Sequence, residues 1–267
     1  MERKNWRRRW SMLITKIERL ETSGDRRGLI KKLSHPEGPS ILAFVNAHAM
    51  NLLASSQSFY KSLGVADTVV RDGSGMEILF DQLIIPPGIN LNGTDLIPDL
   101  IQQFNGRCIA LFGTQNPYLE DGANFVKQHL APQSKCITAD GFLDDNAYIS
   151  LACERRPALI VLGMGMPRQE EVAVALRAKL DYPCLIICGG AIIDFMGGKT
   201  NRAPIWMRRA GLEWLYRLNM EPRRLFQRYV IGNVIFLVRV IILTTVNQRL
   251  GEQVIKRQVK PSASARK

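Results

Sequence analysis

The chain has 267 residues, of which 46% are hydrophobic and 22% charged, and its formal net charge is +12. This composition is that of a globular protein large enough to bury a sizeable core, and it excludes a wholly disordered chain. The five cysteines form no C-x-x-C pair and no segment has the core of a signal peptide, so we expect a reducing, cytoplasmic environment.

The positive charge is concentrated at the two ends of the chain. Residues 1–32 carry 11 basic and 4 acidic side chains, residues 33–198 carry 10 and 17, and residues 199–267 carry 15 and 3. Such blocks indicate ends that meet an acidic partner and a middle that folds as a soluble domain, although surplus charge that only aids solubility is the alternative. We therefore divide the chain into a basic N-terminal helical segment (1–35), an α/β domain (36–198) and a basic, amphipathic C-terminal appendage (199–267).

Short apolar, β-branched runs alternate with helical periodicity between residues 39 and 190, a pattern typical of parallel strands joined by crossover helices. The predicted strands are 41–46, 68–71, 108–113, 136–139, 158–163 and 185–188, and the predicted helices are 47–62, 74–83, 94–105, 117–130, 143–154 and 167–179. The fold class is therefore α/β: a Rossmann-like, doubly wound, mostly parallel six-stranded sheet with a C-terminal helical, membrane-associating appendage. In such sheets ligands bind beyond the carboxyl ends of the strands.

Polar residues follow the first two predicted strands. Asn46 ends the first and can offer its amide to a base, a ribose or a sugar hydroxyl, or simply cap the next helix. His48 is either a general base or a capping and packing residue. Asp72 and Gly73 follow the second strand, where glycine lets backbone N–H groups approach a phosphate or sugar, and where the carboxylate is either a general base or a helix cap.

Glycines mark two further strand ends. The turn at Gly113 resembles half of a phosphate-binding loop but lacks G-x-G-x-x-G. The loop with Gly163 and Gly165 leads into a helix whose first turn holds Arg168 and Gln169, which suits a nucleotide diphosphate, although a third glycine is missing. The sequence contains no D-x-D pair and no Walker motif, and its three histidines are scattered, so we predict no metal site.

Without a metal, the charge of a diphosphate must be met by backbone amides and arginines, and the segment 202–228 is dense in arginine. The candidate binding residues in the appendage are Arg202, Arg208, Arg217, Arg223 and Arg224. Asp194, at the end of the last predicted strand, either binds a ligand hydroxyl or pairs with Arg202.

An apolar run at residues 229–246 follows these arginines. Its length approaches the ~20 residues of a membrane span, but Arg239 and Asn233 make insertion costly. We therefore expect an interfacial helix on an anionic membrane rather than a span, with a helix buried against the body and a paired Arg239 as the third possibility. We assign Trp214 to packing, and we expect no nucleic-acid binding because the basic and aromatic residues precede a Val- and Ile-rich run.

Several motifs together resemble the WecG/TagA/CpsF family of glycosyltransferases, in the family's order over roughly residues 40–230. The motifs are DGSG at 72–75, NGTD at 92–95, GMGMPRQE at 163–170 and GAIIDFMGGKTNRAPIWMRRAGLEWLYRLNMEPRR at 190–224. The opening FVNAHAMN at 44–51 looks more like the GumM-type glucosyltransferases of xanthan-like polysaccharide synthesis than the N-acetylmannosamine transferases. One departure concerns Phe44, because the family often has Thr there, which puts the identity of the donor or acceptor sugar in doubt.

The resemblance implies a peripheral enzyme on the cytoplasmic face of the inner membrane. It would transfer a hexose of the glucose or N-acetylmannosamine type from a UDP-sugar to a polyprenyl-diphosphate-linked sugar, forming a β-linkage by inversion and needing no metal or other cofactor. Asp72 would deprotonate the acceptor hydroxyl, Asn46 and Gln169 would hold a sugar, and the appendage arginines would stabilise the departing UDP. A homo-oligomer stays possible, and a non-catalytic membrane-binding or nucleic-acid-binding protein is the alternative.

Overall fold

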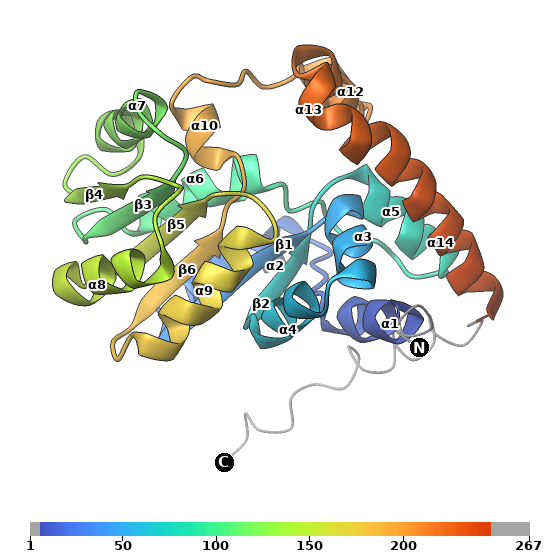
Figure 1. Ribbon diagram of the computed structural model, residues 1–267, viewed down its shortest axis with the longest axis horizontal. Helices are drawn as coiled ribbons and strands as arrows, with labels where there is room; N and C mark the ends of the chain where they lie inside the picture. The colour runs from blue at the N-terminus through green and yellow to red at the C-terminus, as the bar shows by residue number, and fades with distance from the viewer. Residues whose placement is uncertain (1–5, 247–267) are drawn as a thin grey trace.

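A computed structural model of the protein describes residues 6–246, so residues 1–5 of the predicted N-terminal segment and residues 247–267 of the predicted appendage lie outside the described part (Figure 1). The sheet has six parallel strands in the order β2-β1-β6-β5-β3-β4. The strands are β1 (Pro39–Val45), β2 (Thr68–Arg71), β3 (Ile109–Gly113), β4 (Cys136–Ala139), β5 (Leu159–Gly163) and β6 (Cys184–Cys188). The predicted α/β class and parallel sheet are therefore confirmed.

Helices precede the sheet and connect its strands. They are α1 (Trp6–Lys16), α2 (Ser23–Leu33), α3 (Ala47–Ser55), α4 (Gln57–Val65), α5 (Ser74–Gln82), α6 (Gly93–Gln103), α7 (Tyr118–Phe125) with η2 (Val126–Leu130), α8 (Asp145–Arg155), α9 (Arg168–Lys179) and α10 (Ile192–Met196). The prediction of one helix at 47–62 is wrong because Ser56 is extended and begins a new helix. Its hydroxyl caps α4 by accepting a hydrogen bond from the Phe59 N–H at 3.1 Å.

Successive side chains of a strand point to opposite faces of the sheet, so they pack in two different hydrophobic cores. Ile41 and Ala43 of β1 pack with α1, α3, α4, α5, α8 and α9, whereas Leu42 and Phe44 pack on the other face with α2, α6, α7 and α10. Because helices cover both faces, the strands read as continuous apolar runs. Helix α1 is part of the first core, since Trp10 is fully buried and its Nε1 donates to the Met50 carbonyl at 2.8 Å.

The order of the strands opens a crevice at one end of the sheet. The chain passes from β1 outward to β2, crosses to β3 and β4 at the other edge, and returns through β5 and β6 to lie beside β1 again. Helices α3 and α10 follow the neighbouring strands β1 and β6 but pack on opposite faces. The space between these strand ends is the place where open α/β sheets bind ligands.

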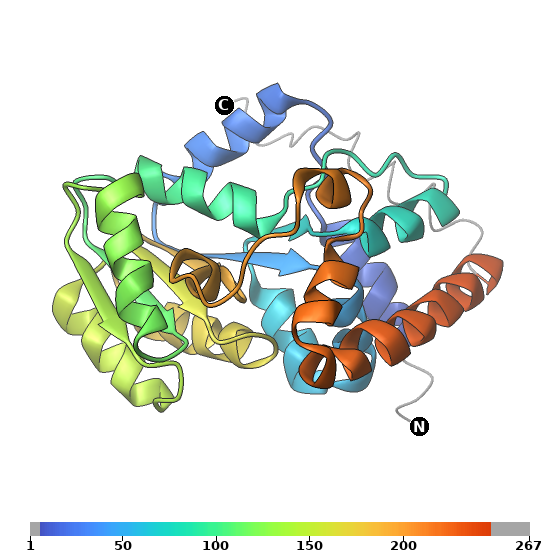
Figure 2. The same cartoon turned by 90° about the horizontal axis from the view of Figure 1, so that it is seen from above.

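Beyond α10 the chain forms α11 (Ile205–Arg209), α12 (Glu213–Met220), α13 (Pro222–Phe226), η3 (Gln227–Ile231) and α14 (Gly232–Val246). Figure 2 shows this stretch leaving α10, passing through α11 to α13 and reaching α14. Helix α14 contacts α3 and α5 and buries Phe236, Val240 and Leu243 in the core that includes α1. Within residues 6–246, the continuous helical stretch Pro222–Thr245 is long and apolar enough to cross a membrane, judged by length and composition only.

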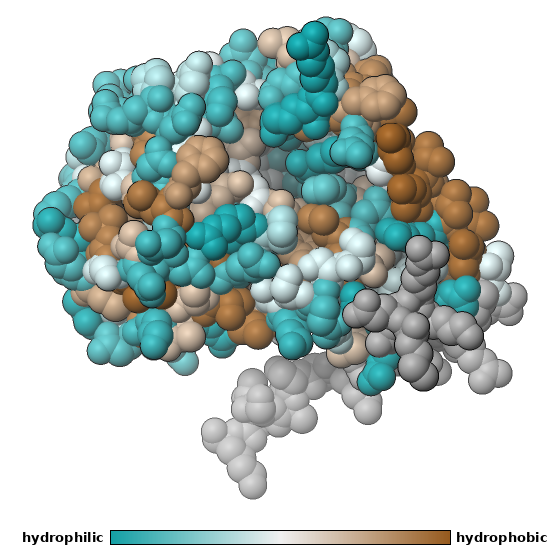
Figure 3. All heavy atoms as spheres, in the orientation of Figure 1, coloured by the Kyte–Doolittle hydropathy of each residue, from teal (hydrophilic) through white to brown (hydrophobic). Residues whose placement is uncertain are grey.

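Arg239 lies on the side of α14 that faces the body. Its Nη1 donates to Asn51 Oδ1 at 2.8 Å, and its guanidinium lies 5.9 Å from the centre of the Trp6 ring. The pairing that one of our three alternatives requires is therefore present. An exposed apolar face remains, visible as a brown band where Figure 1 places α14 (Figure 3), and this face suits an interfacial helix. Its residues are Ile231, Val234, Ile235, Leu237, Val238 and Ile241.

Candidate active site

A cavity of about 790 Å³ lies beyond the carboxyl ends of β1, β2, β5 and β6, with the appendage forming its remaining walls. Most of the predicted site residues line it: Asn46, Asp72, Gly73, Gly163, Gly165, Gln169, Asp194, Arg202, Arg208, Arg217 and Arg224. Loops far apart in the sequence thus meet at one site, as the parallel sheet requires.

Two predicted binding residues do not line the cavity. A Cβ at Gly113 would lie 2.5 Å from the backbone of Gly163, so glycine is needed for the close approach of β3 and β5. Arg223 is exposed on α13. For Gly113 the structure therefore gives a packing reason rather than a ligand-binding one.

Hydrogen bonds donated by two successive backbone N–H groups fix the position of Asp72 at the cavity wall. Its N–H donates to the Val45 carbonyl at 2.8 Å, and the next N–H, of Gly73, donates to Asn90 Oδ1 at 3.0 Å. Gly73 has a φ of +89°, a conformation that favours glycine. Helix α5 begins without a side-chain cap, so the Asp72 carboxylate is not used as the helix cap that our alternative proposed.

The surroundings of Asp72 make its carboxylate more basic than usual. Burial raises the pKa of Asp72 to about 6, and the Glu213 carboxylate acts in the same direction. Arg228, Arg217 and Arg71 oppose this shift in the pKa. A carboxyl group with such a pKa is ionised at neutral pH and still accepts a proton readily, which suits a general base.

Asn46 and His48 stand at the start of α3 and line the same cavity. Asn46 Oδ1 accepts a hydrogen bond from the Ala49 N–H at 3.0 Å, so the capping role is confirmed, while the amide also belongs to the cavity wall. Burial lowers the pKa of His48 to about 4, with a smaller contribution from Arg228. The imidazole is therefore neutral at pH 7 and can exchange hydrogen bonds with a polar ligand.

Gln169 has both ends of its amide engaged by the protein. Its Nε2 donates to Glu170 Oε1 at 2.8 Å, and its Oε1 accepts from the Gly190 N–H at 2.8 Å. The side chain is fully buried, so this geometry favours a role in fixing the β6–α10 loop over direct contact with a sugar. Burial raises the pKa of Glu170, which sequence reasoning did not select, to about 8, so its carboxyl is largely protonated at pH 7.

Asp194 and Arg202 do not pair with each other, so that alternative is wrong. Asp194 Oδ1 accepts from Thr114 Oγ1 at 2.5 Å and from Lys199 Nζ at 3.3 Å. Arg202 instead forms a bidentate pair with Asp95, at 2.7 and 3.1 Å. The reason is spatial: the first turn of α6 carries Asp95 to the segment between α10 and α11.

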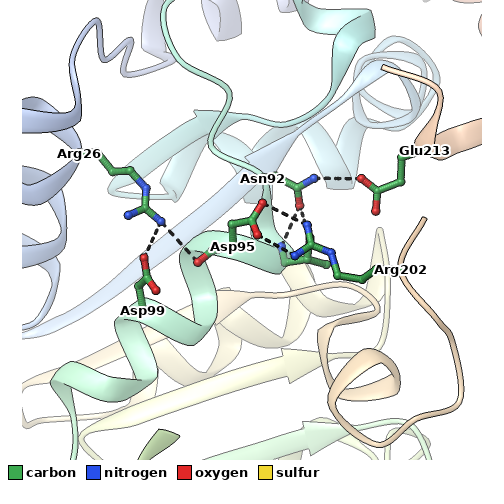
Figure 4. A network of polar contacts seen from close by, with 7 residues as sticks. Arg26, Asn92, Asp95, Asp99, Arg202 and Glu213 are labelled. Atoms are coloured by element: carbon green, nitrogen blue, oxygen red, sulfur yellow. Dashed lines mark hydrogen bonds and ion pairs between the residues drawn. The ribbon is translucent and has the colours of Figure 1, made fainter. Parts of the chain in front are cut away.

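Figure 4 shows the polar contacts that join the appendage to the body at this point. Arg202 binds Asp95, and Asn92 Nδ2 donates to Glu213 Oε2 at 3.3 Å. Arg26 binds Asp99 on the next turn of α6 at 2.7 Å. Because Asp95 neutralises Arg202, this arginine joins the appendage to the body and is not a free cation at the cavity.

A different set of arginines is available to a ligand. Arg208, Arg217 and Arg228 line the cavity, and their Nε atoms are buried without a hydrogen-bond partner in the described part of the chain. Arg224, by contrast, is paired with Glu221 at 2.8 Å. A buried Nε–H that has lost its water and has no protein partner gains from an anion, so an anion at this wall would be stabilising.

Arg228 was missed by the sequence prediction, where only the arginine density of segment 202–228 pointed to it. Residues 6–246 hold no group of three or more His, Cys, Asp or Glu side chains that could bind a metal ion. In this part of the chain the positive charge at the cavity is therefore supplied by guanidinium groups.

Comparison with known proteins confirms the family that the motifs resemble. A sequence profile described as the glycosyl transferase WecG/TagA/CpsF family matches residues 11–250. An N-acetylglucosaminyldiphosphoundecaprenol N-acetyl-beta-D-mannosaminyltransferase of Staphylococcus aureus strain MW2 is 26% identical over 184 residues, covering 67% of this chain and 72% of that protein. Its counterpart from strain NCTC 8325 is 25% identical with the same coverage. Since the profile spans nearly the whole chain, the protein belongs to the WecG/TagA/CpsF family of glycosyltransferases.

Proposed function

We propose that the protein transfers a hexose of the glucose or N-acetylmannosamine type from a UDP-sugar to a sugar carried on polyprenyl diphosphate. The S. aureus relatives are named for transfer of N-acetylmannosamine to N-acetylglucosaminyldiphosphoundecaprenol, which supports this class of acceptor. The observation that carries the proposal is the presence, in one cavity, of the basic carboxylate of Asp72 and of arginines whose Nε atoms have no partner within residues 6–246.

Asp72 acts as the general base of an inverting displacement. It takes the proton from the acceptor hydroxyl while the hydroxyl oxygen forms a bond to the anomeric carbon of the donor. The bond from that carbon to the diphosphate oxygen breaks, and its electron pair leaves with UDP. Attack from the face opposite UDP gives a β-linked product.

Arg208, Arg217 and Arg228 stabilise the negative charge that grows on the diphosphate as it leaves. Guanidinium groups pair well with phosphate oxygens and need no bridging metal, so we propose a metal-independent reaction. Asn46 and the neutral His48 offer hydrogen bonds to sugar hydroxyls.

The donor sugar is the part of the proposal that depends most on one residue. Phe44 borders the cavity but is only 4% exposed, so its ring lies mainly in the core at the position where the family often has a threonine. No hydroxyl is offered to the sugar at this position, which disfavours a donor that needs a hydrogen bond there. We therefore keep glucose and N-acetylmannosamine as the two donor types to be compared.

We further propose a peripheral location at the cytoplasmic face of the inner membrane, in the synthesis of a cell-surface exopolysaccharide. The exposed apolar face of α14 and the nearby arginines suit an anionic membrane surface. Each basic side chain near such a surface contributes about 1 kcal/mol, so several of them hold the protein there without a lipid anchor.

The test is a transfer assay with purified protein, polyprenyl-diphosphate-linked glucose or N-acetylglucosamine, and a panel of UDP-sugars. One donor and acceptor pair should give a disaccharide whose new linkage is β by NMR, at a rate unaffected by EDTA. An α-linked product contradicts inversion, and inhibition by EDTA that added metal reverses contradicts metal independence. The absence of product with every pair, with binding to anionic vesicles retained, favours a non-catalytic membrane-binding protein instead.

A further inference from the structure

One side of the cavity is apolar. It is lined by Ile78 of α5, Val230 of η3, and Val234 and Leu237 of α14. These side chains are between 37% and 59% exposed, with Val230 the least and Val234 the most exposed. Large apolar side chains left open at a cavity wall favour an apolar ligand.

The apolar side continues out of the cavity along α14. Val234, Leu237 and Ile241 follow one another at spacings of three and four residues, so they lie on one face of the helix. Val234 and Leu237 line the cavity, whereas Ile241, 60% exposed, lies beyond it. Because Val234 and Leu237 line the cavity and all three side chains are exposed, the apolar face of α14 extends from the cavity to the outside of the molecule, where Figure 3 shows a brown band.

The inner end of this stripe is close to the proposed chemistry. A Cβ at Gly75, in the first turn of α5 and three residues after Asp72, would lie 3.7 Å from the Phe236 ring of α14. Arg228 immediately precedes Tyr229 and Val230, and all three line the cavity. The site therefore brings a carboxylate, guanidinium groups and an apolar stripe together at one wall.

A sugar on polyprenyl diphosphate carries a hydroxyl that matches the carboxylate and an apolar chain that matches the stripe, with a diphosphate between them. We propose that Ile78, Val234 and Leu237 form a binding site for the first isoprene units of the acceptor, which enters the cavity along α14. This inference rests on the proposed function and deepens it, because the protein then recognises the lipid itself as well as the sugar and diphosphate. It also gives the stripe a role inside the cavity that contact with a membrane surface alone would not require.

The experiment measures binding of farnesyl diphosphate and of inorganic diphosphate to the full chain by calorimetry, without membrane or detergent. The unmodified protein should bind farnesyl diphosphate roughly tenfold or more tightly than inorganic diphosphate, because apolar surface is buried. The substitutions Ile78→Gln and Leu237→Gln should each weaken binding of farnesyl diphosphate roughly 5- to 20-fold and leave the affinity for inorganic diphosphate unchanged.

Two matched controls are available on the same elements. Ile84 follows α5 and is 87% exposed, Ile235 of α14 is 41% exposed and lies outside the stripe, and neither lines the cavity. The substitutions Ile84→Gln and Ile235→Gln should keep the preference for farnesyl diphosphate. Equal losses in the Leu237 and Ile235 variants, or no preference in the unmodified protein, overturn the inference and leave the stripe as a membrane contact only.

The calorimetric titration tests the isoprenoid site and the transfer assay tests the proposed function, so either claim can be contradicted without the other. Calorimetry needs no sugar transfer, so a protein that makes no disaccharide can still display the isoprenoid site. Conversely, formation of a disaccharide without any preference for farnesyl diphosphate keeps the proposed function and removes the isoprenoid site.

Discussion

The α/β body and the C-terminal appendage are built in opposite ways. Every residue of β2 and β3 is buried, whereas α11 and α12 have no buried residue at all. In the body, Gln169 uses both its amide oxygen and its amide nitrogen, although Glu170 Oε2 keeps no partner in the described chain. In the appendage, the unpartnered buried atoms of Arg208, Arg217 and Arg228 are all guanidinium nitrogens at the cavity. Because these nitrogens gather at one cavity wall, an anionic ligand there can satisfy them.

This contrast gives a rule for substitutions. A change inside the body should chiefly cost stability, because the two cores are closely packed. A change in α11 or α12 of the appendage should chiefly cost activity, since these helices contribute no buried side chain, whereas α14 is anchored in the core by Phe236, Val240 and Leu243. The strand-end loops are part of the body. Because they line the cavity, however, substitutions in them should chiefly cost activity, as in the appendage.

The largest expected effect is that of Asp72→Asn. Loss of the general base should lower kcat/KM roughly 10²- to 10⁴-fold in the transfer assay, while thermal unfolding and vesicle binding stay unchanged. Asp81→Asn is the matched control, because Asp81 is exposed on α5 and does not line the cavity. A variant of Asp72 that keeps most of the activity would show that the proton is accepted by another group.

The pH profile tests the same carboxylate without changing the chain. Burial raises the pKa of Asp72 to about 6, and the base works when ionised, so kcat/KM should be level above that pH. Below it, kcat/KM should fall about tenfold per pH unit. Because Glu213 also raises the pKa of Asp72, Glu213→Gln should move the acid limb to lower pH, whereas Glu120→Gln, on the exposed side of α7, should not. An acid limb that does not move in the Glu213 variant contradicts this coupling.

Arg228→Gln should lower kcat/KM roughly 10²-fold, since it removes one donor from the departing diphosphate. Stability should be unchanged or slightly higher, because a poorly compensated charge is removed from the cavity wall. Arg209→Gln is the control, as Arg209 is exposed and does not line the cavity. Parallel steady-state kinetics and urea unfolding separate the two effects, and a loss of stability matching the loss of activity would contradict the rule above.

The sequence predicts the elements of the body far better than those of the appendage, because burial imposes a pattern on the sequence of the body. Strands covered on both faces must be continuous apolar runs, so their positions are found within about two residues. The break at Ser56 is missed because a single serine that caps a helix also fits inside one. Helices α11 and α13 are only five residues long, too short for an apolar period to predict their bounds.

At the site, residue positions are predictable but their partners are not. Strand-end residues such as Asp72 and Asn46 can be placed because a parallel sheet brings its carboxyl ends together. Arg202 meets Asp95, 107 residues earlier in the chain, and only the folded structure makes that choice. Arg228 was not predicted because it directly precedes an apolar run, and no local pattern in the sequence predicts that Glu170 is buried.

A smaller effect, on stability alone, is expected for Glu170 in the body. Burial raises its pKa from 4.5 to about 8, so the folded state holds a proton that the unfolded state releases. The free energy of unfolding should therefore fall as the pH rises from about 4.5 to 8 and level off above, by a few kcal/mol at about 1.4 kcal/mol per pKa unit. Glu170→Gln should flatten this dependence in urea unfolding, and a variant as pH-dependent as the unmodified protein would contradict the assignment.

The smallest effect is expected at the contact between Arg202 and Asp95, where the two regions meet. The side chains are 29% and 55% exposed, and pairs of this kind contribute about 1 kcal/mol or less. Arg202→Gln and Asp95→Asn should each lower kcat/KM by less than about fivefold, and the double variant should lose no more than either alone, because the same bond is broken. Arg26→Gln, which removes the neighbouring pair with Asp99, is the control and should leave kcat/KM unchanged. A loss of 10²-fold in the Arg202 variant alone would instead place this arginine on the substrate, since an ion pair so exposed is too weak to produce such a loss through the position of the appendage.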